Sequence, residues 1–74
     1  MDLARILGAN VRRERKRLGK SQEELALDAA MKRAYVSDLE RGTRNPSIKA
    51  IARLAAVLGV NPSSLLETPS KDRD

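Results

Sequence analysis

The chain of 74 residues contains no cysteine and no histidine. Their absence excludes disulfides, catalytic thiols, zinc sites built from Cys and His, and general-base catalysis by histidine. No apolar run approaches the roughly 20 residues of a membrane-spanning helix. The N-terminal stretch also lacks the basic start and the long apolar core of a secretion signal. We therefore expect a cytoplasmic protein without a metal ion, cofactor, small-molecule ligand or membrane partner.

Aromatic residues are almost absent as well, since the chain has one Tyr and neither Phe nor Trp. Its apolar side chains are mainly Ala, Leu, Val and Ile, which suit packing between helices better than a β-sandwich or a barrel. A domain of this length buries only about 60% of the surface that its unfolded chain exposes. Its core leaves little surplus stability, and association with a second copy would add to it. The composition favours one all-α domain.

Positive charge predominates, with a formal net charge of +5, and it is unevenly distributed. Residues 1–53 contain 13 Lys and Arg against 7 Asp and Glu, whereas residues 54–74 contain 2 against 3. A basic body of this kind indicates an anionic partner such as nucleic acid. The plain alternative is a basic surface that only aids solubility.

Residues that typically start or end helices divide the chain into short segments. Gly19, Gly42 and Gly59 each follow a stretch with helical spacing. A capping box at residues 21–24 and two prolines mark the starts of further helices. These signals predict a compact five-helix domain over residues 1–67 and a disordered polar tail over 68–74. The expected helices cover about 3–18, 21–29, 32–41, 47–58 and 62–67. The expected core residues are Leu3, Leu7, Val11, Leu18, Leu25, Ala26, Ala29, Val36, Leu39, Ile48, Ile51, Leu54, Ala55, Leu58, Leu65 and Leu66.

Residues 22–41 contain the most informative spacing. Ala26 stands fifth in this stretch, and Val36 and Leu39 stand fifteenth and eighteenth. Two helices joined by a three-residue turn nearly touch, which requires a small residue at the fifth place. The stretch resembles the helix-turn-helix of the Cro and phage-repressor family, also called the Xre family. The segments that carry the resemblance are SQEELA at 21–26, YVSDLERG at 35–42, RNPS at 44–47 and LAAVLGV at 54–60.

The resemblance covers about residues 6–67 and implies a lambda-repressor-like fold. It implies a sequence-specific DNA-binding transcriptional regulator that reads a palindromic operator as a dimer, with the third helix in the major groove. The segments ERG and RNPS are especially like the controller proteins of restriction–modification systems. One departure is Ala30, where the family often has Gly in the turn. Either the turn differs slightly here, or Ala30 adopts a left-handed conformation at a cost of about 1–2 kcal/mol.

The third helix would bury Val36 and Leu39 and turn its other side outward. The residues expected to contact base edges are Lys32, Arg33, Ala34, Tyr35, Ser37 and Asp38. Arg33 is the first candidate, because a guanidinium can donate two hydrogen bonds to guanine. Tyr35 has the alternative of a core-edge residue, and Lys32 that of a solvated or phosphate-binding lysine. Asp38 either accepts a hydrogen bond from cytosine or holds Arg41 or Arg33 in place.

The candidates for phosphate contacts are Gln22, Arg41, Arg44, Asn45 and Ser47. Ser47 lies at a helix start, where backbone amides favour anions. The resemblance places a backbone-binding glutamine at Gln22 and similar contacts in the loop of Arg44 and Asn45. Such contacts set position but carry no sequence information.

Two opposite charges fall on stripes that are otherwise apolar. Arg15 follows Val11 by four residues, and Glu40 follows Val36 by four. We expect these charges to form a largely buried ion pair between the first and third helices. The alternative is that Arg15 belongs to the solvated basic run Arg12–Arg17.

The expected homodimer would use apolar residues near the fifth helix. The candidates are Val57, Val60, Pro62, Leu65 and Leu66, which could instead only close the monomer core. A different function is an antitoxin-type module that binds a partner protein and DNA, although the tail is short and polar for a partner-binding arm. Membrane-surface binding would need large apolar residues beside the basic ones. An enzyme is not expected, because Glu23, Glu24 and Asp28 would lie on the exposed side of a short helix.

Overall fold

The computed structural model describes residues 2–68, which contain four α-helices and one 3-10 helix. The helices are α1 (Leu3–Arg17), α2 (Gln22–Asp28), α3 (Arg33–Glu40), α4 (Ile48–Leu58) and η1 (Pro62–Leu66). The all-helical architecture is confirmed, with the fifth helix in the 3-10 form. Within residues 2–68 no helix combines the length and the apolar character needed to cross a bilayer. Apart from residue 68, the tail expected to be disordered lies outside the described residues.

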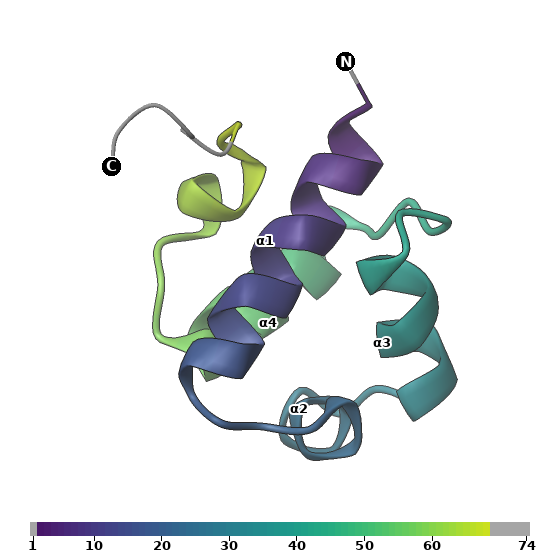
Figure 1. Cartoon of the computed structure of the whole chain (residues 1–74), viewed down its shortest axis with the longest axis vertical. Helices are drawn as coiled ribbons and strands as arrows, with labels where there is room; N and C mark the ends of the chain where they lie inside the picture. The colour runs from purple at the N-terminus through teal and green to yellow at the C-terminus, as the bar shows by residue number, and fades with distance from the viewer. Residues whose placement is uncertain (1, 69–74) are drawn as a thin grey trace.

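Helix α1 crosses the middle of the molecule and organises the other elements (Figure 1). Helices α2 and α3 lie on one side of it and η1 on the other, with α4 packed behind. The helix starts are set by local side chains. Ser21 Oγ accepts from the Glu24 amide at 3.0 Å, and Glu24 Oε1 accepts from the Ser21 amide at 2.8 Å, so the predicted capping box is confirmed. At the start of α4, Ser47 Oγ accepts from the Ala50 amide, without a reciprocal bond.

The core lies between α1 and the other four helices. Its buried members are Leu7, Val11, Leu25, Ala26, Ala29, Val36, Leu39, Leu54, Ala55, Leu58 and Leu65. Four residues expected in the core are exposed, namely Leu3 (49%), Leu18 (40%), Ile48 (86%) and Leu66 (36%). Each lies in the first or last turn of its helix or just beyond it, where no neighbouring helix covers it. Helical periodicity identified the correct face but not the length over which that face is packed.

Gly8 marks the point where α1 and α3 approach most closely. A Cβ atom at this position would lie 2.9 Å from the Glu40 carbonyl oxygen and nearer still to that of Leu39. Real side chains do not pack at such distances from backbone atoms. The two helices can therefore cross here only because residue 8 has no side chain. The crossing holds the end of α3 directly against the middle of α1.

Asn10 is polar but completely buried in α1. Its Nδ2 donates hydrogen bonds to the carbonyl oxygens of Leu65 at 2.7 Å and Glu67 at 2.9 Å. These bonds attach η1 to α1 and enclose Leu65, whose side chain is 0% exposed. The expectation that Leu65 lies at a dimer interface is therefore wrong, because its own chain covers it. No local sequence signal marks Asn10 for this role.

The turn between α2 and α3 contains backbone strain. Ala30 has a φ of 58°, which is the left-handed region that side chains rarely adopt. The Met31 amide donates to the Ala26 carbonyl oxygen at 2.8 Å and closes the turn in this conformation. Of the two alternatives for this position, the strained one is confirmed.

Ala30→Gly should raise the free energy of unfolding by roughly 0.5–1 kcal/mol. Glycine removes the left-handed strain of about 1–2 kcal/mol, and part of the gain is lost to its greater freedom in the unfolded chain. Urea denaturation followed by circular dichroism measures the change. Ala52→Gly, on the exposed face of α4, is the matched control and should lower stability by about 1 kcal/mol. An equal loss in both variants would show that Ala30 carries no strain.

Candidate nucleic-acid interface

Helix α3 buries one side and presents the other to solvent. Val36 and Leu39 are 0% and 1% exposed and anchor the helix in the core. On the outer side, Arg33, Ala34 and Arg41 are exposed, while Ser37 and Asp38 are partly exposed. Lys32 is exposed at the N-cap, and Tyr35 is half-buried at one edge of the helix. All six candidates for base contacts therefore have at least part of their surface free on one helix.

Arg15 and Glu40, the two charges on apolar stripes, form a bidentate ion pair. Arg15 Nε donates to Glu40 Oε2 at 2.7 Å, and Arg15 Nη2 donates to Glu40 Oε1 at 3.0 Å. The side chains are only 11% and 3% exposed. Hydrogen bonding to the Glu40 carboxylate raises the pKa of Arg15 above its usual value. The pair joins α1 to the C-terminal end of α3, where a carboxylate alone would be opposed by the helix dipole.

The same carboxylate binds α2 through the candidate Gln22. Gln22 Nε2 donates to Glu40 Oε1 at 3.1 Å. Arg15 Nη1 in turn donates to the Lys20 carbonyl oxygen at 2.8 Å, just before α2 begins. Glu40 thus connects three helices, and the orientation of α3 depends on α1 and α2 together.

Asp38 holds arginines on the exposed side of α3. It forms an ion pair with Arg41, one turn later, and one of its carboxylate oxygens lies 3.8 Å from Arg44 Nε. Arg44 in turn lies over the Tyr35 ring, with its Cζ atom 4.9 Å from the ring centroid. In the described residues Asp38 pairs with Arg41 and Arg44 and not with Arg33. These contacts order two of the predicted phosphate-binding arginines beside the helix.

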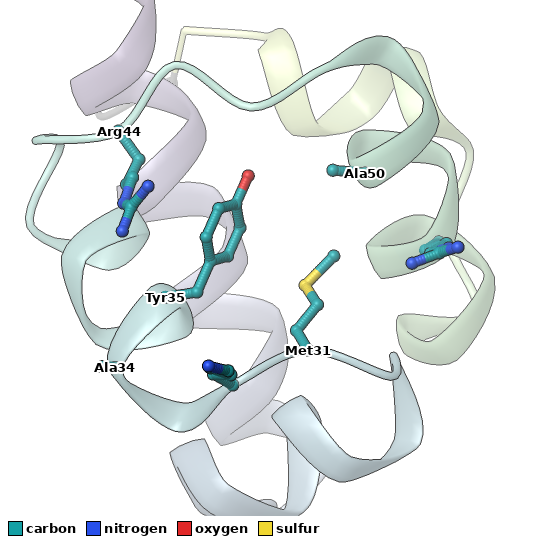
Figure 2. Close-up of a pocket in the computed structure, with 7 residues that line it drawn as sticks. Met31, Ala34, Tyr35, Arg44 and Ala50 are labelled. Atoms are coloured by element: carbon teal, nitrogen blue, oxygen red, sulfur yellow. The ribbon is translucent and has the colours of Figure 1, made fainter.

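A pocket of about 330 Å³ lies between α3 and α4, next to Tyr35 (Figure 2). Its apolar part comes from Met31, Ala34 and Ala50, and the Tyr35 hydroxyl points across it. Three cationic side chains complete the lining, namely Lys32, Arg44 and Arg53. Arg53 was not among the candidates predicted from the sequence, where its only signal is its place on the exposed side of α4. The arrangement suits an anionic group carried on a partly apolar body.

A second depression, of about 410 Å³, lies on the other flank of α3. It opens between α1, α2 and α3, and all its lining residues are polar. They are Arg12, Arg15, Lys16, Gln22, Ser37, Glu40 and Arg41. The exposed stripe of α3 therefore runs between two basic hollows, one on each side.

The remaining candidates are distributed over the loop before α4 and the surface near η1. Asn45 is exposed, and the Ser47 hydroxyl oxygen accepts from the Ala50 amide at 3.1 Å. Pro62 and Leu66 are exposed, whereas Val57 and Val60 pack partly against the core. Only part of the expected dimer surface is free on this chain.

Comparison with known proteins places this geometry in a family. A family model described as helix-turn-helix matches residues 11–65. Control protein C.BamHI from Bacillus amyloliquefaciens is 43% identical over 63 residues, which cover 84% of this chain and 78% of that protein. The crystal structure of the hypothetical transcription factor NHTF from Neisseria has a TM-score of 0.89 and 43% identity, over 92% of this chain and 78% of that chain.

A further relative, the transcriptional regulator SinR from Bacillus subtilis, is 36% identical over 63 residues, covering 84% of this chain and 57% of that protein. A crystal structure of SinR in complex with DNA matches with a TM-score of 0.79 and 37% identity, over 82% of this chain and 98% of that chain. The family match includes α2, α3 and the turn between them. The chain therefore belongs to the helix-turn-helix family, of the Xre type.

Proposed function

We propose that the protein is a sequence-specific DNA-binding transcriptional regulator that inserts α3 into the major groove. The observation that carries this proposal is the exposed stripe of α3 between two basic hollows. The major groove is about 12 Å wide and admits one α-helix, with a phosphate ridge on each side. The complex of SinR with DNA and the names of the other relatives, which are regulators and not enzymes, support the same function.

Base readout falls to the N-terminal half of α3. Arg33 and Ala34 are exposed there, so Arg33 can donate to guanine O6 and N7 while Ala34 packs against a thymine methyl. Ser37 lies one turn further along and can donate or accept at the next base edge. Asp38 acts by positioning Arg41 and Arg44, since its carboxylate forms ion pairs with both.

Phosphate contacts fall to the two hollows beside α3. On one flank, Lys32, Arg44 and Arg53 line the same pocket as Tyr35, which favours a phosphate contact for Lys32 and Tyr35 over a base contact. Asn45 and Ser47 extend this flank at the start of α4. On the other flank, Gln22 and Arg41 lie at the rim of the polar depression. These groups fix the register of α3 on the duplex.

The regulator acts as a homodimer. Its location is the cytoplasm. One small domain buries too little surface for tight specific binding, and two half-sites about 34 Å apart allow two copies to bind together. Of the residues expected at this contact, Pro62, Leu66 and the exposed edges of Val57 and Val60 are free. Control of a restriction–modification system is the narrower role that the ERG and RNPS segments suggest. Sedimentation of a monomer both alone and on operator DNA would rule out the dimer.

Arg33→Ala should relax the preference at one base position of the operator. The operator is first obtained by selecting random duplexes with the full chain. Loss of the guanidinium then removes about 1–3 kcal/mol of discrimination at that position, while the other positions keep their preference. Arg44→Ala is the comparison variant, because loss of a phosphate contact should weaken binding to all sequences alike. A wild-type chain that enriches no duplex in the selection would refute the proposed function.

A further inference from the structure

The basic run of α1 is divided by its carboxylate partners. Arg13 and Arg17 both bind Glu14, at 3.4 and 2.7 Å, and hydrogen bonding to Arg17 lowers the pKa of that glutamate. Arg15 is engaged by Glu40. Among residues 2–68, Arg12 and Lys16 have no carboxylate within salt-bridge distance. The run is therefore not a uniformly solvated face.

Arg12 and Lys16 face the same hollow. They are four residues apart, which places them one above the other on one side of α1. Both line the polar depression beside α3, together with Gln22 and Ser37. Like charges at this spacing on a helix repel each other. An anion placed between the two side chains would remove this repulsion.

The charge of the depression is strongly positive once internal pairs are counted. Glu40 is the only carboxylate in its lining, and Arg15 neutralises it. Arg12 and Lys16 then remain, since Arg41 at the rim is paired with Asp38. No apolar residue contributes to the lining, in contrast to the pocket between α3 and α4. The depression suits a hydrated oxyanion and offers no surface to an apolar ligand.

We propose that Arg12 and Lys16 make α1 a further DNA-contacting element, which binds backbone phosphates on the flank of α3 away from Tyr35. The inference rests on the proposed function and deepens it, because it assigns the strand that α1 contacts. Phosphates on the two sides of the major groove belong to opposite strands. With Arg44 and Arg53 on one strand and Arg12 and Lys16 on the other, α3 is held from both sides.

Because α1 and α3 are rigidly connected, a phosphate contact made by α1 also affects the position of α3 on the duplex. Gly8 places α1 against the end of α3, and the Arg15–Glu40 pair joins the same two helices. A phosphate bound by α1 therefore fixes the tilt of α3 in the groove. Arg12 and Lys16 contribute affinity and position but no base preference.

The test is the double variant Arg12→Gln/Lys16→Gln of the full chain, binding the selected operator and a scrambled duplex between 50 and 200 mM salt. Each lost phosphate contact lowers the slope of log K against log salt by about 0.9. We expect the slope to fall by about 1.8 on both duplexes, with the base preference from selection unchanged. The matched control is Arg13→Gln/Arg17→Gln, which removes the same charge from side chains already bound to Glu14. It should change the slope by less than about 0.5.

Equal slopes in the two double variants would overturn the inference, because net charge alone would then explain the effect. An unchanged slope for Arg12→Gln/Lys16→Gln, or a changed base preference, would also overturn it. Thermal unfolding of both variants checks that they fold equally. A wild-type chain that binds no duplex marks failure of the proposed function itself, whereas wild-type binding with indistinguishable variants marks failure of the α1 contact alone.

Discussion

Replacing Arg15 by alanine should lower the free energy of unfolding by about 3–5 kcal/mol, because it leaves the Glu40 carboxylate buried without its counter-charge. Glu40 is 3% exposed and would keep only the hydrogen bond from Gln22. A domain of this size has a total stability of roughly 4–11 kcal/mol. The variant should therefore be partly unfolded at 37 °C. Urea denaturation measured by circular dichroism, and extrapolated to water, gives the loss.

Two further variants separate the buried pair from simple loss of an arginine. Arg17→Ala removes an arginine whose side chain is 53% exposed and should cost less than about 1 kcal/mol. The double variant Arg15→Met/Glu40→Leu removes both charges and should recover most of the lost stability, since apolar replacement of a buried pair is often neutral. The bracing of α3 by this pair would be refuted if Arg15→Ala and Arg17→Ala had equal effects.

Gly8→Ala should lower the free energy of unfolding by about 2–3 kcal/mol, opposite in sign to what helix propensity predicts. In an exposed helix, alanine in place of glycine stabilises by about 1 kcal/mol. Here the new methyl group would overlap the carbonyl oxygens of Leu39 and Glu40, which belong to backbone and cannot rotate away. Overpacking of this kind forces the helices apart. The variant should also lose DNA affinity, because α3 would shift in the groove.

The neighbouring residue supplies the control for this variant. Ala9→Gly, at an exposed position of α1, should cost about 1 kcal/mol by propensity alone and should leave DNA binding unchanged. A Gly8→Ala variant that is as stable as the wild type, or more stable, would show that the close crossing of α1 and α3 is not required. Denaturation and a binding isotherm on the same samples measure both effects.

Local signals predicted most of the fold. The start of α2 was evident from Ser21 and Glu24, and the end of α4 from Gly59, because caps and left-handed glycines act within a few residues of themselves. The partners Arg15 and Glu40 could be found because each breaks an apolar stripe. Ile48 was placed wrongly, since periodicity does not reveal where a neighbouring helix stops covering a face.

Contacts between distant segments could not be predicted from the sequence. Nothing near Gly8 shows that the carbonyl groups of α3 lie against it, and nothing near Asn10 shows that its amide binds the chain beyond η1. Arg53 belongs to the candidate interface because α4 lines a pocket together with Tyr35, which only the tertiary structure shows. In each case the partner lies more than 15 residues away along the chain. Spacing rules for single helices do not extend that far.

The connection of three helices through Glu40 affects how the DNA preference of such a regulator can change during evolution. The side chains that hold α3 come from its inner surface and its C-terminal end, through Glu40, Val36 and Leu39. Arg33 and Ala34 take no part in that bracing. New operator preferences can therefore arise by substitution at these two positions while the scaffold is inherited unchanged. A duplicated gene could in this way acquire a separate set of targets, because every intermediate variant would still encode a folded protein.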